Sequence, residues 1–322
     1  MKAVVVTGYG PPETYTVADV PVPRPGPGQL LVRIAAASIN PADVRLPSGA
    51  FHDVAPLEFP HVPGNDFAGT VTEVGAGVTG YQVGDEIFGQ AVPRALRAMA
   101  GVNRPSLSTG SLAEYAVFEA DTPFLAHRPP GLGIEQAAAL PTVGLTARAL
   151  MATANVRPGE TVLVIGATGG VGTAVVPLLA EAKARVIATA TAADADLLRA
   201  LGADQTIGYA EAEYPSGVDV AFNLTLPSDQ LTGVARAVRS GGRLLTITYP
   251  VPQQEWIGRD DVALHFVLDM DGTLGGMREV GELAAAGRLP ATIGRRYTLD
   301  EGGQACVDFA REHTTGKLVV AM

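Results

Sequence analysis

The sequence predicts an α/β protein in which a β-rich region is combined with a doubly wound parallel sheet. Up to about residue 125, short β-prone runs are separated by clusters of proline and glycine. From about residue 126, nearly continuous apolar runs alternate with helical patterns, as expected when helices connect buried parallel strands. One of these runs ends in "VIGATGGVG" at 164–172, which has four glycines within seven residues.

Composition narrows the class of protein. Of 322 residues, 47% are apolar and 17% are charged, which is typical of a well-buried globular enzyme and not of a disordered chain. The net charge of −10, without clustered Lys or Arg, argues against nucleic-acid binding. The single cysteine, Cys306, excludes an intramolecular disulfide and suggests a reducing compartment. Because we find neither a signal peptide nor an unbroken apolar span, we expect a soluble, cytoplasmic protein.

The first part of the chain is predicted to form a barrel or a sandwich. Turn-rich stretches such as "PVPRPGPGQ" and "GAGVTGYQVGD" separate its strands. Residues 91–111 form an insertion with basic and apolar side chains, which we expect to act as a lid over the substrate. The strands expected here are 2–6, 30–39, 69–74 and 113–118.

The second part is predicted to be the parallel sheet, and the last part returns to mixed helix and strand. Strands are expected at 161–166, 185–190, 204–209, 218–225 and 243–248, with helices at 171–183, 194–202 and 228–240. Near the end of the chain we expect helices at 274–287 and 301–312, and strands at 292–299 and 316–322.

The glycine-rich turn sits where a dinucleotide would bind. It follows the strand at 161–166 and opens the helix at 171–183, and the strand at 185–190 completes a βαβ unit. Ala167, Gly169 and Gly172 take the three glycine places of the dinucleotide fingerprint. The alternative is a purely structural bend. The residues expected to contact the cofactor are Gly166, Ala167, Thr168, Gly169, Gly170, Val171 and Gly172.

The end of the second strand bears on the choice of cofactor. Thr189, Ala190 and Thr191 are not acidic, so none of them would repel the 2′-phosphate of NADPH. We therefore expect these three residues to contact NADPH. NADH remains the alternative, because acidic residues follow at Asp194 and Asp196 and no basic residue comes before Arg199.

Several motifs, together with the glycine turn, resemble a known family. They are "SINPADV" (38–44), "VPGNDFAGTVTEVGAGVTGYQVGDEIFG" (62–89), "EQAAALPTVGLTA" (135–147) and "LGADQTIGY" (201–209). In this order the chain resembles, over 1–322, the zinc-free quinone oxidoreductase branch of the medium-chain dehydrogenase/reductase superfamily. The resemblance implies a GroES-like catalytic domain (1–125 and 266–322) and a Rossmann nucleotide-binding domain (126–265). It also implies a homodimer joined through an edge strand, either "RLLTITYP" or "LHFVLD".

The resemblance also identifies where zinc-dependent relatives hold their metal. This chain has Asn40 in place of a cysteine, Asn65 and Asp66 in place of a histidine and a glutamate, and no cysteine near Pro141. We therefore expect no zinc and interpret Asp66 as a structural carboxylate. Without a Lewis acid, the implied chemistry is hydride transfer to a quinone or to a C=C bond conjugated to a carbonyl.

The resemblance places Asn40 beside the nicotinamide, where its amide can bind a substrate carbonyl or the ribose. The alternative for Asn40 is an Asx turn before Pro41. Further cofactor contacts follow from the resemblance and from the expected cofactor side of the sheet. They are Thr142, Thr146, Tyr209, Leu224, Thr225, Thr248, Tyr249, Phe266 and Val267.

The substrate side departs from the family pattern. Relatives often carry tyrosines shortly after the "NPxD" motif, whereas this chain has Arg45 and Phe51. Arg45 could bind a carboxylate, a phenolate or an oxyanion, or it could be a solvated loop residue. No general acid is identified. The expected function is an NADPH-dependent quinone or enone reductase. The alternatives are an enoyl reductase acting on a thioester or polyketide-type intermediate, and a non-catalytic NADPH-binding protein.

Overall fold

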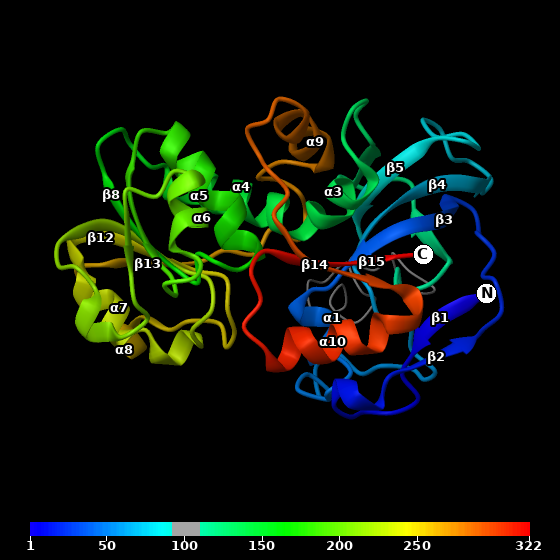
Figure 1. The fold of residues 1–322 in the computed structure, drawn as a ribbon, viewed down its shortest axis with the longest axis horizontal. Helices are drawn as coiled ribbons and strands as arrows, with labels where there is room; N and C mark the ends of the chain where they lie inside the picture. The colour runs from blue at the N-terminus through cyan, green and yellow to red at the C-terminus, as the bar shows by residue number, and fades with distance from the viewer. Residues whose placement is uncertain (92–109) are drawn as a thin grey trace. The chain divides into compact units, whose positions relative to one another are not determined.

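The computed structural model describes residues 1–91 and 110–322, which form two compact units (Figure 1). The β-rich unit comprises Met1–Thr142, Met270–Ala286 and Ile293–Met322. The parallel-sheet unit comprises Val143–Asp269 and Gly287–Thr292. The lid expected at 91–111 lies outside the described residues, apart from its ends. The α/β fold class is confirmed, with one unit built from both ends of the chain.

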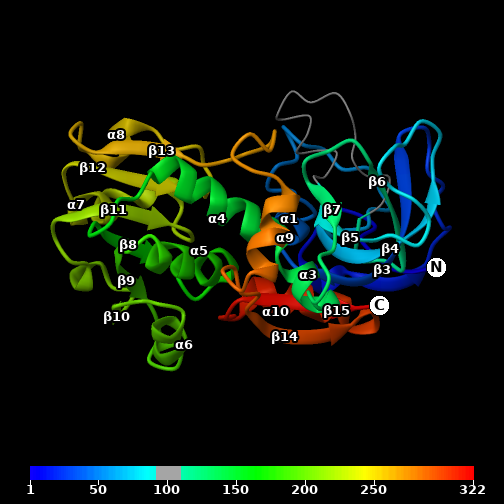
Figure 2. The same ribbon diagram turned by 90° about the horizontal axis from the view of Figure 1, so that it is seen from above.

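The β-rich unit is organised around the long strand β3 (Gln29–Ser38). The C-terminal strand β15 (Lys317–Ala321) lies beside β3 (Figure 2). The two strands pair antiparallel, and Val319 is opposite Ser38. On its other side β3 pairs with β4 (Asp66–Val74). The remaining strands are β1 (Lys2–Val5), β2 (Thr16–Asp19), β5 (Glu86–Gln90), β6 (Tyr115–Glu119), β7 (Leu125–His127) and β14 (Ile293–Thr298).

Short helices complete the β-rich unit. Helix α3 (Ile134–Ala139) packs on β3, β4 and β15, which explains why the division between the units comes at Thr142/Val143, later than the 125/126 expected. This division falls within α4 (Pro141–Ala154). The other helices of the unit are α1 (Pro41–Arg45), α9 (Met277–Ala285) and α10 (Gly302–Arg311), with 3-10 turns at Pro12–Thr14 and Leu299–Glu301.

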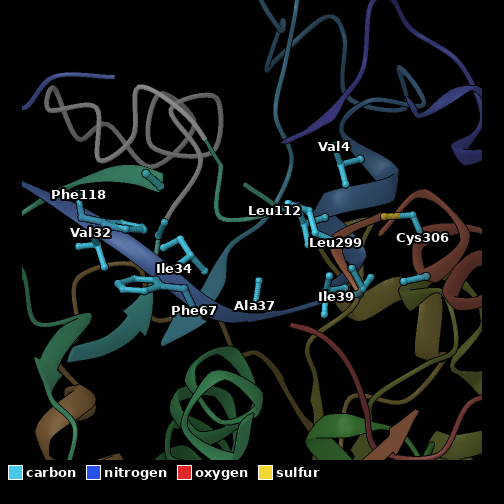
Figure 3. Packing of buried hydrophobic residues seen from close by; sticks show 14 of the residues in the cluster. Val4, Val32, Ile34, Ala37, Ile39, Phe67, Leu112, Phe118, Leu299 and Cys306 are labelled. Carbon is cyan, nitrogen blue, oxygen red and sulfur yellow. The ribbon is translucent and has the colours of Figure 1, made fainter. Parts of the chain in front are cut away.

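Apolar side chains from β3, β4, β6 and α10 form the core of this unit (Figure 3). The rings of Phe67 and Phe118 stack with centroids 3.8 Å apart. Burying a side chain of this size contributes about 1.5–3 kcal/mol. Cys306 is buried in the same core, and burial raises the pKa of its thiol.

The parallel-sheet unit has the strand order β10-β9-β8-β11-β12-β13, and all of its neighbouring strands are parallel. This is the Rossmann order, in which the chain changes direction between β8 and β11 and ligands bind at the carboxyl ends of the strands. The strands are β8 (Thr161–Ile165), β9 (Arg185–Thr189), β10 (Gln205–Ile207), β11 (Val218–Asn223), β12 (Val238–Thr246) and β13 (Ala263–Phe266). The helices are α5 (Gly170–Glu181), α6 (Ala195–Ala200), α7 (Thr232–Ala237) and α8 (Gln254–Ile257), with 3-10 turns at Glu211–Glu213 and Ser228–Gln230.

The predicted C-terminal end of one helix is wrong. The helix predicted over 228–240 is α7, which stops at Ala237, and Val238 already belongs to β12 and pairs with Val218 of β11. Gly241 has φ +71°, in the left-handed region that a continuing helix could not use. The apolar spacing there belongs to a short helix followed at once by a strand. Among the described residues, we find no helix with both the length and the apolar character needed to cross a bilayer.

Candidate active site

The glycine turn after β8 is held in place by a buried threonine. Gly166 has φ +83°, and a Cβ at this position would lie 3.1 Å from Thr225. The Gly166 N–H donates to Thr189 Oγ1 (3.0 Å), and the same hydroxyl donates to the Val164 carbonyl (3.4 Å). Thr189 is fully buried, so its side chain ties the turn to β9.

Two glycines of the turn differ in what the fold requires of them. A Cβ on Gly172 would lie 2.4 Å from both the Cα and the carbonyl oxygen of Ala167, so only glycine lets α5 pack this closely. A Cβ on Gly169 would meet only the Gly166 carbonyl oxygen, at an ordinary 3.5 Å. The protein therefore has no packing reason to keep Gly169 bare. The missing side chain leaves the start of α5 open.

The start of α5 is suited to an anion. No side-chain cap bonds its first turn, and that turn contains no acidic residue. The first amides of a helix have no partner within the helix and carry the positive end of its dipole. Beside them, Thr168 Oγ1 lies 3.1 Å from the hydroxyl of Tyr209, whose side chain is 40% exposed. A phosphate group fits this arrangement.

Other expected cofactor residues gather at the carboxyl ends of the strands. The Leu224 N–H donates to the Ile165 carbonyl (3.0 Å), which brings Leu224 and Thr225 to the glycine turn. The rings of Tyr249 and Phe266 meet edge to face with centroids 5.3 Å apart. The N–H of the next residue, Val267, donates a hydrogen bond to the Thr246 carbonyl oxygen of β12. The predicted residues at the ends of β11, β12 and β13 therefore gather along the carboxyl edge of the parallel sheet.

A hydroxyl-rich cluster beneath this edge was not predicted. Buried Asn223 places Nδ2 at 2.9 Å from Thr246 Oγ1 and 3.1 Å from Thr248 Oγ1. Ser228 Oγ lies 3.0 Å from Thr246 Oγ1 and bonds the Thr248 carbonyl. Only the polar letters at the ends of two apolar runs, "FNLT" and "LLTIT", signal this cluster. It holds together the loops that follow β11 and β12.

The end of β9 carries an acid. The Ala190 N–H bonds the Ile207 carbonyl, and Thr191 Oγ1 donates to Asp194 Oδ2 at 2.6 Å. Asp194 is largely buried, so its carboxylate is held close behind Thr191. A carboxylate therefore lies beside Thr191 at the end of β9, the strand end at which Rossmann folds in general distinguish NADPH from NADH.

In the β-rich unit, Asn40 stands at the start of α1 and is buried. Its N–H donates to Asp43 Oδ2 (2.7 Å), and the Gly64 N–H donates to Asp43 Oδ1 (2.9 Å). Burial raises the pKa of the Asp43 carboxyl to about 7, although these two bonds act to lower it. The Asp43 N–H donates to the Asn40 backbone carbonyl (3.0 Å), so Asn40 and Asp43 together begin α1.

The Asn40 side chain accepts a hydrogen bond from Lys317, a residue that sequence reasoning missed. Lys317 Nζ donates to Asn40 Oδ1 (2.6 Å) and to Asp66 Oδ2 (3.3 Å). Asn40 Nδ2 donates to the Ser38 carbonyl (3.2 Å). Burial lowers the pKa of Lys317, and the carboxylates of Asp66 and Asp43 oppose that shift.

Asp66 joins this cluster to the start of α4. Its Oδ1 accepts hydrogen bonds from the N–H (3.1 Å) and the hydroxyl (2.6 Å) of Thr142. Gln90 Nε2 donates to the same hydroxyl (3.1 Å). Thr142, expected to contact the cofactor, is thus fixed by the β-rich unit, while Thr146 lies one turn later on α4.

Arg45 and Phe51, the expected substrate residues, lie together. The Arg45 guanidinium carbon is 5.2 Å from the centroid of the Phe51 ring, within cation–π range. Arg45 is exposed and Phe51 is half-buried. The pair therefore presents a flat apolar ring with a positive charge above it.

The positions of the zinc ligands in relatives carry poor donors here. Asn40 and Asn65 are amides, and Asp66 Oδ2 already faces the Lys317 ammonium. Among the described residues, no group of three or more His, Cys, Asp or Glu side chains is placed to hold a metal ion. This donor set does not fit zinc, which prefers thiolate and imidazole ligands.

Comparison with known proteins agrees with this architecture. Residues 26–130 match the family model "Alcohol dehydrogenase GroES-like domain", and residues 201–320 match "Zinc-binding dehydrogenase". The chloroplastic quinone-oxidoreductase QR1 of Triphysaria versicolor is 29% identical over 99% of this chain and 98% of its own. The 2-methylene-furan-3-one reductase of Solanum lycopersicum is 30% identical over 99% of this chain and 79% of its own. The phthioceranic/hydroxyphthioceranic acid synthase of Mycobacterium tuberculosis is 32% identical over 92% of this chain, which spans 14% of the synthase.

Solved structures share the fold over the whole chain. A quinone oxidoreductase from Coxiella burnetii has a TM-score of 0.86 at 27% identity, covering 100% of this chain and 99% of that one. An NAD-dependent alcohol dehydrogenase scores 0.83 at 30% identity, covering 100% of both chains. A mycobacterial protein in complex with NADPH scores 0.84 at 26% identity, again covering 100% of both chains. The chain therefore belongs to the medium-chain dehydrogenase/reductase superfamily and is an oxidoreductase related to its quinone and alkenal/one oxidoreductases.

Proposed function

We propose that this protein is an NADPH-dependent reductase that delivers hydride to a quinone or to a C=C bond conjugated to a carbonyl. The observation that carries the proposal is the bare Gly169 at the open start of α5, beside a Gly172 that packing requires. A turn that served only as a bend would have no reason to leave Gly169 without a side chain. A turn that binds a diphosphate has such a reason, because a side chain at this position would keep the diphosphate from the backbone amides.

The residues of the parallel-sheet unit fit a dinucleotide. The amides of Gly170, Val171 and Gly172 would bind its pyrophosphate, and Tyr209 would lie along the phosphates. NADPH, when bound, supplies the hydride. We favour NADPH over NADH because 189–191 contain no acid and because a solved relative holds NADPH. The carboxylate of Asp194 keeps NADH as the second candidate.

The β-rich unit supplies the polar contact for the acceptor. Asn40 would donate an amide hydrogen to the carbonyl oxygen of the substrate, where negative charge develops during reduction. Phe51 would stack on a flat acceptor, and Arg45 would attract a phenolate or enolate. The Lys317 cation already occupies the carboxylate of Asp66, so we propose that the reaction proceeds without zinc.

Turnover with defined acceptors tests this function. Purified protein is mixed with NADPH and, in turn, with naphthoquinones and alkenals, and the loss of nicotinamide absorbance is followed. We expect turnover with at least one acceptor class, lost in Gly169→Val and kept after treatment with a zinc chelator. Absence of turnover with every acceptor would contradict the proposal.

A second candidate is an enoyl reductase acting on a thioester. It is favoured by the similarity to the mycobacterial synthase and by the exposed charge of Arg45. Efficient reduction of an enoyl-thioester with poor quinone activity would select it. Tight NADPH binding without reduction of any acceptor would instead support a non-catalytic binding protein.

We further propose a cytoplasmic homodimer joined through β13. In the described part of the chain, β13 ends the parallel sheet on one side, whereas β12, which contains the first half of "RLLTITYP", is paired on both sides. Of the two expected edge strands, only "LHFVLD", which contains most of β13, therefore offers unpaired backbone groups. Light scattering of the intact protein and of Leu264→Pro, which should be monomeric, tests this proposal.

A further inference from the structure

The function proposed above gives the buried ammonium of Lys317 no part in hydride transfer. Its Nζ lies 2.6 Å from Asn40 Oδ1, 2.7 Å from the Ile39 carbonyl oxygen and 3.3 Å from Asp66 Oδ2. An ammonium group has three hydrogens and no lone pair, so these three acceptors account for every hydrogen it can donate. Lys317 is therefore a fixed cation inside the β-rich unit. It is not a proton donor to substrate.

This cation sets the orientation of the Asn40 amide. Oδ1 must face the ammonium, which only donates, and Nδ2 must face the Ser38 carbonyl, which only accepts. The reverse orientation would place a donor against Lys317 and an acceptor against Ser38. One hydrogen of Nδ2 is used by Ser38. The second has no partner among the residues that the structure describes, so it is the group Asn40 can offer to a ligand.

We infer that Lys317 is a positioning residue for the reductase: it holds the Asn40 amide in one orientation and polarises its second N–H toward the carbonyl oxygen of the acceptor. The inference rests on the proposed function, in which Asn40 binds that oxygen. A cation bonded to an amide oxygen withdraws electron density from the amide nitrogen, which strengthens the hydrogen bonds that the nitrogen donates. As hydride arrives, the acceptor oxygen becomes negative, and a polarised donor stabilises that charge.

The surroundings explain how a cation is kept in this place. Asp66 is fully buried and bonds Lys317, and Asp43 lies near enough to oppose the effect of burial on the Lys317 pKa. Removing Lys317 alone would leave Asp66 as a buried, uncompensated charge, which is strongly destabilising. The effect of Lys317 must therefore be measured in a background where Asp66 is neutral.

Four proteins form the test: Asp66→Asn, and the same variant combined with Lys317→Met, with Asn40→Ala, or with both. With a naphthoquinone as acceptor, we expect Asn40→Ala to lower kcat by roughly a hundredfold and Lys317→Met by about tenfold. If Lys317 acts through Asn40, adding Lys317→Met to Asn40→Ala changes kcat by less than about twofold. Adding Lys317→Met to Asp66→Asn leaves the KM for NADPH unchanged. The inference would be overturned if the losses in kcat from Asn40→Ala and Lys317→Met multiplied in the combined variant, or if Lys317→Met caused no loss in kcat.

A binding measurement reads the same effect without turnover. A nitrophenol bound in the presence of NADP⁺ reports by its absorbance how much of it is ionised. We expect Asp66→Asn/Lys317→Met to lower the ratio of bound phenolate to phenol by about tenfold relative to Asp66→Asn, which is one pKa unit of the probe. An equal ratio in the two proteins would refute the role of Lys317. A wild type inactive with every acceptor would instead refute the proposed function, and the two failures are therefore separable.

Discussion

Replacing Gly169 with valine while replacing Gly172 with alanine separates the two roles that glycines play in the turn. Gly169 has φ −71° and ψ 175°, which any residue can adopt, and its added Cβ would touch only one carbonyl oxygen, at 3.5 Å. Gly172→Ala would instead push a Cβ to 2.4 Å from backbone atoms of Ala167. The first change should therefore affect the ligand, and the second should affect the fold.

The expected magnitudes follow from these distances. A side chain at Gly169 would keep the pyrophosphate from the helix amides, and each charge-assisted bond lost is worth about 1.5–3 kcal/mol. The Kd for NADPH should therefore rise by roughly ten- to a hundredfold, since about 1.4 kcal/mol is tenfold. Overpacking at Gly172 should cost about 1–3 kcal/mol or more, which lowers Tm by about 2–4 °C for each kcal/mol.

Two assays on each variant complete the experiment. NADPH titrations followed by nicotinamide fluorescence give Kd, and thermal melts without ligand give Tm. Gly169→Val should have the same Tm as the wild type and should bind NADPH more weakly. Gly172→Ala should melt earlier. An unchanged Kd in Gly169→Val would refute the assignment of this turn to the diphosphate, and a large fall in its Tm would refute the argument from free space.

Three further changes test other parts of the structure. Thr189→Val leaves the partly buried Gly166 N–H without its acceptor, so both Tm and NADPH affinity should fall, at a cost of about 1–3 kcal/mol; a melt and a titration matching the wild type would contradict this. Asp194→Asn removes a negative charge at the end of β9, and should tighten NADPH more than NADH by about threefold; equal changes in the two Kd values would argue against that location of the phosphate. Burial lowers the pKa of His61 from 6.5 to about 4, so the folded protein binds fewer protons than the unfolded chain between these values and stability falls as the pH drops through them. His61→Gln should remove up to about 3 kcal/mol of that loss in denaturant titrations, because each pKa unit corresponds to about 1.4 kcal/mol; a pH slope equal to that of the wild type would contradict the burial of His61.

Local patterns in the sequence were enough to predict the parallel-sheet unit. Its strands and the glycine turn depend on residues close together in the chain, such as the apolar run of β8 and the largely buried, apolar α5 that follows it. The exception is the helix expected to extend to residue 240. There the apolar spacing of α7 runs directly into β12, and only pairing with β11 decides where the helix ends.

The polar cluster around Asn40 was not predictable in the same way. Lys317 reaches Asn40 because β15 and β3 pair, although 277 positions separate the two residues. A lysine at the start of an apolar strand resembles an ordinary solvated residue until that pairing is known. The same holds for Asp66, whose partners Thr142 and Lys317 come from distant parts of the chain.

Transfer of label from NADPH to an acceptor tests the central claim most directly. The protein is mixed with an alkenal and with NADPH deuterated at the transferable position of the nicotinamide, and the product is examined by mass spectrometry and NMR. We predict deuterium on the carbon distal to the carbonyl in the wild type, with a much lower yield from Gly169→Val. The account would be contradicted if the protein bound NADPH to saturation but transferred no deuterium to any product, whether the acceptor was an alkenal or an enoyl-thioester.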